Sequence, residues 1–293
     1  MKVLSLFNGY GAAYLAMQRV GLNVSKYYSS EIDKYANIIS HKNCDCIEDL
    51  GDVRDFAKWN LEEIDILFAG SPCQDLSKIK SKDRKGLKGD KSSLFYSFYG
   101  ALQLHKPKYF LLENVVMPKE DEEVITRLLG VEPILIDSGN FSAQNRERLY
   151  WTNIDFDKEM PKNDSVIKDI MEKEVDQKYY YHGRKYSIHS PNKRVIGNLD
   201  THTDEGKRHF TDLTSRIYNI NYKCSTLTAV SGGHQEKKIY DGTSVRKLTP
   251  LEYERLQTLP DGYTEGVSNS QRYKMLGNGW TVDVIAHILK GLK

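Results

Sequence analysis

The amino-acid sequence predicts an α/β fold in which a mostly parallel sheet is flanked by helices. Three observations support this class: a strand–glycine turn–helix unit opens the chain, apolar runs of strand length recur, and segments of helical spacing separate them. The runs span residues 3–7, 26–30, 65–70, 109–112 and 133–136. With 293 residues, the chain has room for one large domain or two unequal ones.

The run 65–70 ends in a way that marks a candidate site. Gly70-Ser71-Pro72 closes it, and because Pro cannot continue a buried strand, the chain turns there. Cys73 comes next, where open α/β sheets bind ligands, just outside the carboxyl end of a strand. The alternative is a small buried residue near a strand end, so this stretch alone does not establish a nucleophile.

The N-terminal unit has the form of a nucleotide-type site. A buried strand leads into a tight turn with Gly9 and Gly11, and a helix with apolar spacing follows to residue 20. The glycines allow backbone N–H groups to approach a ligand closely. Tyr14 stands where the dinucleotide-binding fingerprint has its third glycine, which disfavours a pyrophosphate cradle. A purely structural turn is the alternative.

Acidic residues follow the next two predicted units. Glu31 comes directly after the run 26–30, where a carboxylate can accept hydrogen bonds from ribose hydroxyls. Asp52 closes a further short unit and could accept a hydrogen bond from an exocyclic amino group. Glu31 could instead cap a helix or remain solvated. With the glycine turn, the two acids predict a nucleoside pocket without a diphosphate clamp.

A basic segment without apolar periodicity follows Cys73. Residues 77–90 are rich in Lys, Arg, Gly and Ser, and a loop of this length in a compact domain is usually functional or mobile. It is predicted either to close as a lid over a polyanion or to be a solvated charge run. A helix is expected over residues 94–104.

The second half of the predicted sheet adds three charged candidates. Glu113 follows the run 109–112, and beside an apolar pocket it could donate a proton near neutral pH. Arg146 and Arg148 alternate as on a strand, so both are expected on one face. Two guanidiniums there could bind a phosphate, fix a carboxylate or polarise a carbonyl.

Composition restricts the class of protein. The net charge of +2 does not by itself indicate a nucleic-acid partner, although it is compatible with a local basic face. The four cysteines fit a reduced intracellular setting, and no metal site is predicted because His41, Cys44 and Cys46 match no familiar zinc spacing. Neither a signal peptide nor an apolar stretch of about 18 residues occurs, so a cytoplasmic location without membrane insertion is expected.

Taken together, the motifs resemble those of the DNA (cytosine-5)-methyltransferases, in the same order along essentially the whole chain. Eight motifs in register make coincidence negligible. The matching motifs are Phe7-x-Gly9-x-Gly11, Glu31, Asp52, Pro72-Cys73-Gln74, Glu113-Asn114-Val115, Gln144-x-Arg146-x-Arg148, the segment from Arg246 to Asp261, and Gly277-Asn278. Parts of the chain are also similar to the catalytic domains of animal de novo methyltransferases, whereas its compact length is typical of a bacterial or phage enzyme.

The resemblance implies the S-adenosylmethionine-dependent methyltransferase fold, which is Rossmann-like, with S-adenosyl-L-methionine as cofactor. Residues 1–176, completed by 271–293, would form the catalytic domain, and residues 177–270 the target-recognition domain and hinge. The cofactor-binding residues carried over by motif are Phe7, Asn8, Gly9, Gly11, Glu31, Ile32, Asp52, Val53, Pro72, Leu94 and Asn278.

The resemblance also implies a covalent mechanism on cytosine in double-stranded DNA. A Cys73 thiolate would add to C6, so that C5 of the ring can attack the methyl group of the sulfonium. Glu113 would relieve the charge at N3, Arg148 would hold the base carbonyl, and Arg146 would support that geometry. The target base would swing out of the duplex to reach these groups.

The sequence changes character between Trp151 and Val245, in the family's recognition region, where Lys, Tyr, His, Asn and Thr dominate. Arg216 is the leading base-reading candidate because arginine binds guanine with two hydrogen bonds, but a phosphate-binding or core-supporting role is an equal alternative. The candidate DNA contacts are Gln74, Ser77, Arg84, Lys85, Arg216, Thr226, Gly232 and Gly233. A monomer that serves a restriction-modification system or orphan bacterial or phage methylation is expected.

Three other functions compete with this interpretation. An RNA (tRNA) cytosine-5 methyltransferase would share the same motifs. A non-catalytic DNA-binding regulator is disfavoured because Cys73, Glu113 and Arg148 are all present. A nicotinamide oxidoreductase is disfavoured because the third glycine of its fingerprint is missing.

Overall fold

The computed structural model describes residues 1–72, 94–200, 212–230 and 235–293. Contacts group the chain into two compact units. Unit 1 comprises Met1–Asp137, Glu147–Glu159 and Val282–Lys293, and unit 2 comprises Ser138–Arg146 and Met160–Thr281. The boundaries expected at residues 176 and 271 remain a prediction, because contact density alone does not define a recognition domain.

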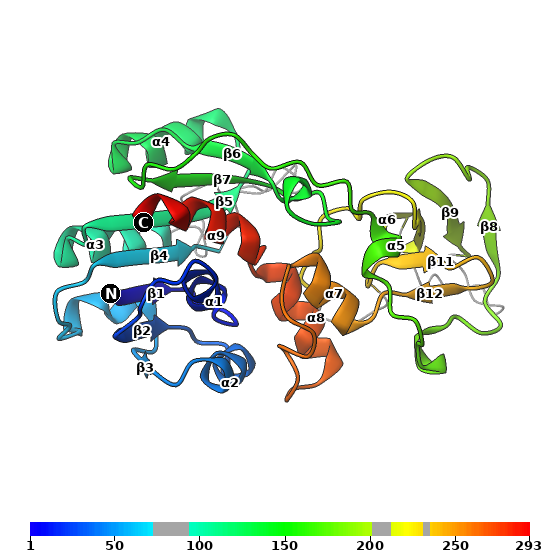
Figure 1. Ribbon diagram of the computed structural model, residues 1–293, viewed down its shortest axis with the longest axis horizontal. Coiled ribbons are helices and arrows are strands. Elements are labelled where there is room, and N and C mark those ends of the chain that lie inside the picture. Colours follow the sequence, from blue (N-terminus) through cyan, green and yellow to red (C-terminus); the bar gives the residue numbers. More distant parts are fainter. Residues whose placement is uncertain (73–93, 201–211, 231–234) are drawn as a thin grey trace. The chain divides into compact units, whose positions relative to one another are not determined.

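Unit 1 is built on a seven-stranded sheet with the strand order β3-β2-β1-β4-β5-β7-β6 (Figure 1). The pairings from β3 to β5 are parallel, whereas β7 runs antiparallel to β5 and β6. A mostly parallel sheet and the five predicted strands are thereby confirmed. The strands are β1 (Lys2–Leu6), β2 (Lys26–Ser30), β3 (Ile47–Asp49), β4 (Ile66–Gly70), β5 (Tyr109–Val115), β6 (Ile134–Asp137) and β7 (Glu147–Thr152).

Helices cover the sheet of unit 1, as burial on both faces of its central strands requires. The helices α1 and α9 lie side by side, joined by an ion pair of 2.6 Å between Arg19 Nη1 and Asp283 Oδ1 (Figure 1). The expected helix over 94–104 is confirmed as α3. The helices of unit 1 are α1 (Ala12–Arg19), α2 (Lys34–Asn43), η1 (Val53–Lys58), α3 (Leu94–His105), α4 (Lys119–Leu129), α9 (Val282–Leu289) and η5 (Lys290–Leu292).

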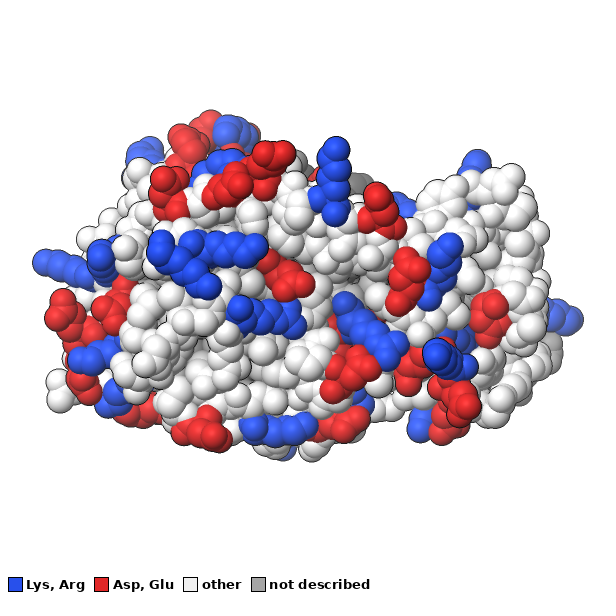
Figure 2. Space-filling view, viewed as in Figure 1, with Lys and Arg blue, Asp and Glu red and all other residues white. Residues whose placement is uncertain are grey.

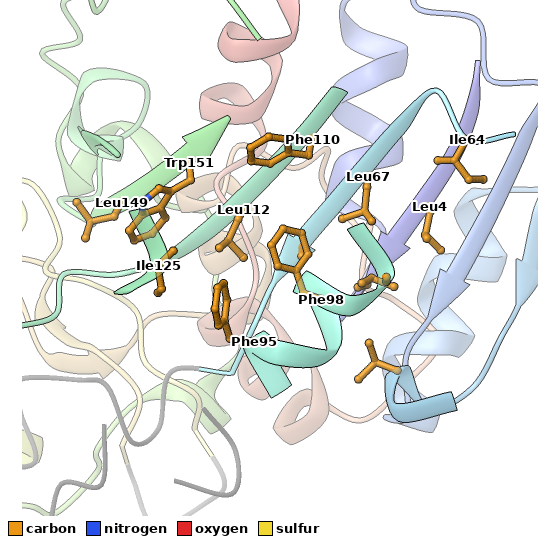
Figure 3. Close-up of a cluster of buried hydrophobic side chains, with 14 of the residues drawn as sticks. Leu4, Ile64, Leu67, Phe95, Phe98, Phe110, Leu112, Ile125, Leu149 and Trp151 are labelled. Atoms are coloured by element: carbon orange, nitrogen blue, oxygen red, sulfur yellow. The ribbon is translucent and has the colours of Figure 1, made fainter. Parts of the chain in front are cut away.

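One hydrophobic cluster fixes α3 and α4 on the sheet (Figure 3). Side chains alternate between the two faces of a strand, so every second residue of β1, β4, β5 and β7 points into this cluster. The side chains of Phe95 and Phe98 from α3 pack there against Leu67 and Leu112, and all four are fully buried. The strand ends that carry the candidate site are therefore set on a rigid core.

Unit 2 contains a five-stranded sheet with the strand order β12-β11-β10-β9-β8. Its strands are β8 (Tyr186–Ile188), β9 (Val195–Leu199), β10 (Arg216–Asn219), β11 (Lys238–Tyr240) and β12 (Val245–Lys247). Its helices are η3 (Ser138–Asn140), α5 (Ile167–Ile170), η4 (Gln177–Tyr179), α6 (Asp212–Ser215), α7 (Pro250–Leu256) and α8 (Asn269–Asn278). A capping box starts α7, because Thr249 Oγ1 accepts from the N–H of Glu252 and the Glu252 carboxylate accepts from the N–H of Thr249.

Lys238 on β11 is a buried cation, and its replacement is expected to stabilise the protein. The side chain is 0% exposed, and burial lowers its pKa from 10.5 to about 8. The folded-state pKa lies below the unfolded one, so the cost of burying the charge is fully present below the folded pKa and disappears as the pH rises towards the unfolded pKa. Lys238→Met should raise the free energy of unfolding at neutral pH by up to about 3 kcal/mol.

Urea denaturation across the pH range measures this gain. The lost hydrogen bond of 2.9 Å from Lys238 Nζ to Glu236 O works against it, and exposed Lys193→Met serves as the control. The advantage of Lys238→Met should shrink in alkaline buffer, and a pH-independent difference would contradict the explanation.

The surface of the described residues gives no single-signed field on the face that Figure 2 shows, where acidic and basic side chains are interspersed. This agrees with the small net charge of +2. Among the helices of the described ranges, none has the length and apolar character needed to cross a membrane. Within the same ranges, no three His, Cys, Asp or Glu side chains gather in the manner of a metal site.

Candidate active site

The carboxyl ends of β4 and β5 place two predicted motifs side by side. Gly70, the last residue of β4, pairs in register with Glu113. Ser71 follows, and its hydroxyl accepts a hydrogen bond of 2.9 Å from Asn114 Nδ2. The segment that leads into Pro72 is therefore anchored on β5. Cys73, the predicted nucleophile, lies outside the described residues.

Glu113 lies within β5, because the strand continues to Val115. The prediction that Glu113 follows the end of this strand is therefore wrong. Antiparallel pairing with β7 supplies the backbone partners that extend the strand beyond Leu112. Since successive side chains alternate, Glu113 points away from the hydrophobic face to which Leu112 belongs.

Arg148 on β7 is the partner of Glu113. It stands opposite Val115 in the register, so it is the diagonal neighbour of Glu113 on the same face. Arg148 Nε lies 2.9 Å from Glu113 Oε1, and the two side chains are only 14% and 9% exposed. The sequence suggested that Glu113 lies beside an apolar pocket. The structure instead places a guanidinium next to this carboxylate. A shielded pair of this kind is a strong charge-assisted interaction that fixes both groups.

Arg146 and Arg148 do not share one face, contrary to the prediction. The strand β7 begins only at Glu147, so Arg146 lies outside its alternation. Arg146 is 4% exposed and donates to Leu227 O at 3.0 Å and to Gly279 O at 3.1 Å. A guanidinium bound to backbone carbonyls has a supporting role, and its assignment as a catalytic residue remains a prediction.

The turn after β1 relies on left-handed backbone. Phe7, Gly9 and Gly11 have φ angles of 57°, 58° and 84°. This region is accessible to glycine at little cost but is uncommon for a bulky residue such as Phe7. A Cβ built at Gly9 would meet no atom within 4 Å, so space is open beside this glycine.

Glu31 closes this turn from the end of β2. Its Oε2 accepts from the N–H of Gly9 at 2.9 Å, and its Oε1 accepts from the N–H groups of Ile32 and Asp33 at 2.8 Å each. A carboxylate has about four acceptor positions, so these three bonds leave it capacity for a ligand hydroxyl. Beside it, Ile32 is 75% exposed, which offers an apolar surface to a flat ring.

Asn8 is buried beneath the turn. Its Oδ1 accepts hydrogen bonds from Tyr27 Oη at 2.7 Å and from Ser5 Oγ at 3.0 Å. These contacts tie the turn to β1 and β2 from below. The side-chain oxygen of Asn8 therefore accepts one hydrogen bond from each of these two strands.

Asp52 and Val53 stand at the start of η1, beyond β3. Asp52 Oδ1 accepts from the N–H of Arg54 at 2.9 Å, and the Arg54 guanidinium pairs with the same carboxylate. These side-chain hydrogen bonds lower the pKa of Asp52, so it is ionised at neutral pH and serves as an acceptor. Val53 is buried and holds η1 against the core.

The predicted cofactor residues thus fall into one group and two outliers. The turn after β1, Glu31, Asp52 and Pro72 follow four neighbouring parallel strands at one edge of the sheet, where α/β proteins bind ligands. Leu94 opens α3 and packs against the hydrophobic cluster. Asn278 is the exposed last residue of α8 and belongs to unit 2.

Two of the predicted DNA contacts, Arg216 and Thr226, are among the described residues, and both belong to unit 2. Arg216 begins β10, is half-buried, and pairs in register with Asn198 of β9. Thr226 Oγ1 donates to Asn145 O at 2.9 Å, so its single hydroxyl proton is committed to the protein. The other predicted DNA contacts lie outside the described residues: Gln74, Ser77, Arg84, Lys85, Gly232 and Gly233.

Two buried polar side chains were not assigned a role from the sequence. Asn114 anchors Ser71, as described above. Gln144 is 0% exposed, and its Oε1 accepts from the N–H of Leu227 at 2.8 Å. Both stand inside motifs that the sequence analysis singled out, and this was the available signal. Their partners are distant in the chain, so the motif alone could not reveal what they bind.

The fold is the α/β fold of the S-adenosylmethionine-dependent methyltransferases. The chain resembles the solved S. pombe Dnmt2 methyltransferase with a TM-score of 0.68, at 19% identity, over 100% of this chain and 99% of that one. It resembles a solved protein encoded within an E. coli prophage with a TM-score of 0.67, at 20% identity, over 100% and 98% of the two chains. The predicted fold class is confirmed.

Comparison of the sequence with known families assigns the chain to one family within this fold class. The family model described as C-5 cytosine-specific DNA methylase matches residues 1–293, so the chain belongs to that family. It is 30% identical to the Type II methyltransferase M.NlaX of Neisseria lactamica, over 100% of this chain and 96% of the relative. It is 25% identical to the Orphan methyltransferase M.SPBetaI of Bacillus phage SPbeta, over 100% and 97% of the two proteins. The resemblance expected from the motifs, and the class of function it implies, are confirmed.

Proposed function

We propose that the chain is a DNA (cytosine-5-)-methyltransferase that methylates C5 of a flipped-out cytosine through a bond between Cys73 and C6. The observation that carries the proposal is the largely shielded Glu113–Arg148 pair, with 2.9 Å between Arg148 Nε and Glu113 Oε1. The register of Gly70 with Glu113 brings the segment that leads to Cys73 to this pair. On this proposal, Cys73 is the nucleophile, Glu113 the proton donor and Arg148 the guanidinium that act on one base.

Each group has a separate task. C5 of cytosine is a weak nucleophile, and a bond from Cys73 Sγ to C6 shifts the ring electrons towards it. The charge that develops on the ring is relieved at N3, where the Glu113 carboxyl, once it has taken up a proton from solvent, donates a hydrogen bond or that proton. Arg148 orients the Glu113 carboxyl and holds the base carbonyl. Once the methyl group is on C5, water accepts the C5 proton, Glu113 takes back the N3 proton, and the C6–Sγ bond breaks, which restores the aromatic ring and the Cys73 thiolate.

S-adenosyl-L-methionine, when bound, supplies the electrophilic methyl group. The residues at the strand ends fit this group: open space beside Gly9, the remaining acceptor capacity of Glu31 for ribose hydroxyls, and the exposed Ile32 for the adenine face. Asp52 provides an ionised acceptor for an amino group. Phe7, Asn8, Gly11, Val53, Pro72, Leu94 and Asn278 complete the proposed cofactor set.

Glu31→Gln is expected to weaken cofactor binding. The substitution replaces a charged acceptor by an amide whose NH2 group would face backbone N–H donors, and hydrogen bonds to charged groups contribute about 1.5–3 kcal/mol. Equilibrium dialysis with labelled S-adenosyl-L-methionine should show a dissociation constant raised by about tenfold or more. Exposed Glu63→Gln is the matched control, and equal affinities of the two variants would argue against this site.

The proposed substrate is double-stranded DNA that contains cytosine, and all proposed reacting groups come from one chain, in keeping with a monomer. The relatives named above support a place in a restriction-modification system or in orphan methylation, in the cytoplasm of a bacterium or a phage-infected cell.

Methyl transfer to nucleic acid tests the proposal directly. The full chain is incubated with tritiated S-adenosyl-L-methionine and either duplex DNA that lacks 5-methylcytosine or total RNA. We expect label in DNA, and bisulfite sequencing of the product then identifies the target site. Label in RNA alone would establish the RNA methyltransferase instead, and no label in either would contradict both.

A further inference from the structure

Two distant segments of unit 2 form a short ladder, and one of them leads directly into β7. The N–H of Cys224 donates to Ala143 O at 2.7 Å, and the N–H of Asn145 donates to Cys224 O at 2.9 Å. Gln144 and Cys224 form a parallel β-bridge between these bonds. The segment 143–146 is therefore held against the start of the predicted recognition signature at 226–229.

Side chains continue the ladder where the backbone bonds end. Thr226 Oγ1 donates to Asn145 O at 2.9 Å, and the N–H of Leu227 donates to Gln144 Oε1 at 2.8 Å. Arg146 Nη1 donates to Leu227 O at 3.0 Å. Each of the residues 144–146 thus binds 226–227 through at least one polar group, which specifies a single register between the two segments.

The side-chain nitrogen of Gln144 belongs to a buried network of amide hydrogen bonds. Gln144 Nε2 donates to Gln257 Oε1 at 3.2 Å, and Gln257 Nε2 donates to Leu276 O at 2.6 Å. Thr281 Oγ1 donates to Gln257 Oε1 at 2.8 Å. Gln144 and Gln257 are both 0% exposed, so no water replaces a lost bond. Buried polar networks of this kind rigidify their surroundings when every member is satisfied.

This network lies where the chain enters β7. Arg146 is the last residue of its segment in unit 2, and β7 begins at Glu147 and carries Arg148. A shift of Thr226 and Leu227 would be passed along the ladder to Arg146 and, through the backbone, to the start of this strand. The placement of Arg148 against Glu113 depends on that start.

We propose that Gln144 is a positioning residue that couples the recognition segment 224–227 to the Arg148–Glu113 pair. This inference rests on the proposed function. Contacts that DNA makes with unit 2 then set the position of the catalytic guanidinium, so part of the discrimination between DNA sequences is expressed in the rate of methyl transfer. A purely structural amide would instead change stability alone.

Gln144→Leu tests the coupling, since leucine fills similar space but leaves the N–H of Leu227 and the Gln257 amide without this partner. The control is Gln103→Leu, an exposed glutamine of α3. Methylated sites from wild-type bisulfite sequencing supply the duplex. At saturating DNA and cofactor, the single-turnover rate of Gln144→Leu should fall by about 10–100-fold, as for a displaced catalytic group. The dissociation constant for the duplex and the rate of the control should match wild type.

Thr226→Val removes the ladder bond to Asn145 O and should lower the same rate constant. If the two residues act through one ladder, the double variant should lose less than the product of the single effects. If circular dichroism shows that Gln144→Leu does not fold, the single-turnover rate constant of Thr226→Val alone tests the coupling.

An unchanged saturating rate in a folded ladder variant would overturn the coupling, as would a loss confined to DNA affinity. Failure of the proposed function looks different, because wild-type protein would then transfer no methyl group to DNA. If wild type methylates DNA and the folded ladder variant is equally active, only the inference about Gln144 is contradicted.

Discussion

Glu113→Gln should lower the single-turnover rate of methyl transfer to DNA by about 10²–10⁴-fold, the usual contribution of a general acid. A glutamine amide can still donate a hydrogen bond to N3, but it cannot transfer a proton. The substitution also removes the charge that fixes Arg148 Nε at 2.9 Å, so the guanidinium loses its anchor. The loss should persist at saturating DNA, because both groups are proposed to act on the base in the chemical step.

Glu147→Gln is the matched control for this prediction. Glu147 also belongs to the same sheet, but its side chain is exposed at the start of β7. We expect its rate constant to equal that of wild type. Full activity of Glu113→Gln, or equal losses in both variants, would show that the Glu113 carboxyl does not take part in the reaction.

Glu252→Ala should lower the free energy of unfolding by about 3–5 kcal/mol, the cost of leaving one partner of a buried ion pair alone. Glu252 and Arg246 are 0% and 1% exposed, and two hydrogen bonds of 2.8 Å and 2.6 Å join them. The same carboxylate accepts from the N–H of Thr249, so the capping box of α7 is lost as well. Chemical denaturation followed by circular dichroism measures the effect.

Asp261→Ala provides a control with the same chemistry at the surface. Arg255 and Asp261 have the same spacing in the chain as Arg246 and Glu252 and also form a two-point pair, at 2.9 Å and 2.6 Å. Their side chains are 31% and 51% exposed, so the pair contributes only about 0–1 kcal/mol. Equal losses in the two variants would mean that burial does not determine the strength of these pairs.

The strands and the ligand edge of unit 1 could be predicted because their signals are local. An apolar run that ends in Gly-Ser-Pro specifies both a buried strand and the point where it stops, and β4 indeed ends at Gly70. The glycine turn after β1 and the acid after β2 each follow their own strand. Parallel order then brings these ends to one edge of the sheet without further information.

The arginine and glutamate side chains could not be placed in this way. Arg146 and Arg148 look equivalent in the sequence, yet the start of β7 at Glu147 separates their environments. The extension of β5 through Glu113 depends on antiparallel pairing with a distant strand. Likewise, no local pattern marks Lys238 as a buried cation. Register and burial arise from tertiary packing, which an isolated motif does not encode.

The central claim is that the thiolate of Cys73 bonds to C6 of a cytosine, and trapping of that bond tests it most directly. Duplex DNA with 5-fluorocytosine in place of cytosine is incubated with the full chain and S-adenosyl-L-methionine. The elimination would have to release fluorine from C5 as a cation in place of the proton, which does not occur, so Sγ cannot depart after methyl transfer. Wild type and Cys46→Ala should each form a DNA adduct that survives denaturing electrophoresis, whereas Cys73→Ala should form none. An adduct with Cys73→Ala, or none with wild type, would contradict the account.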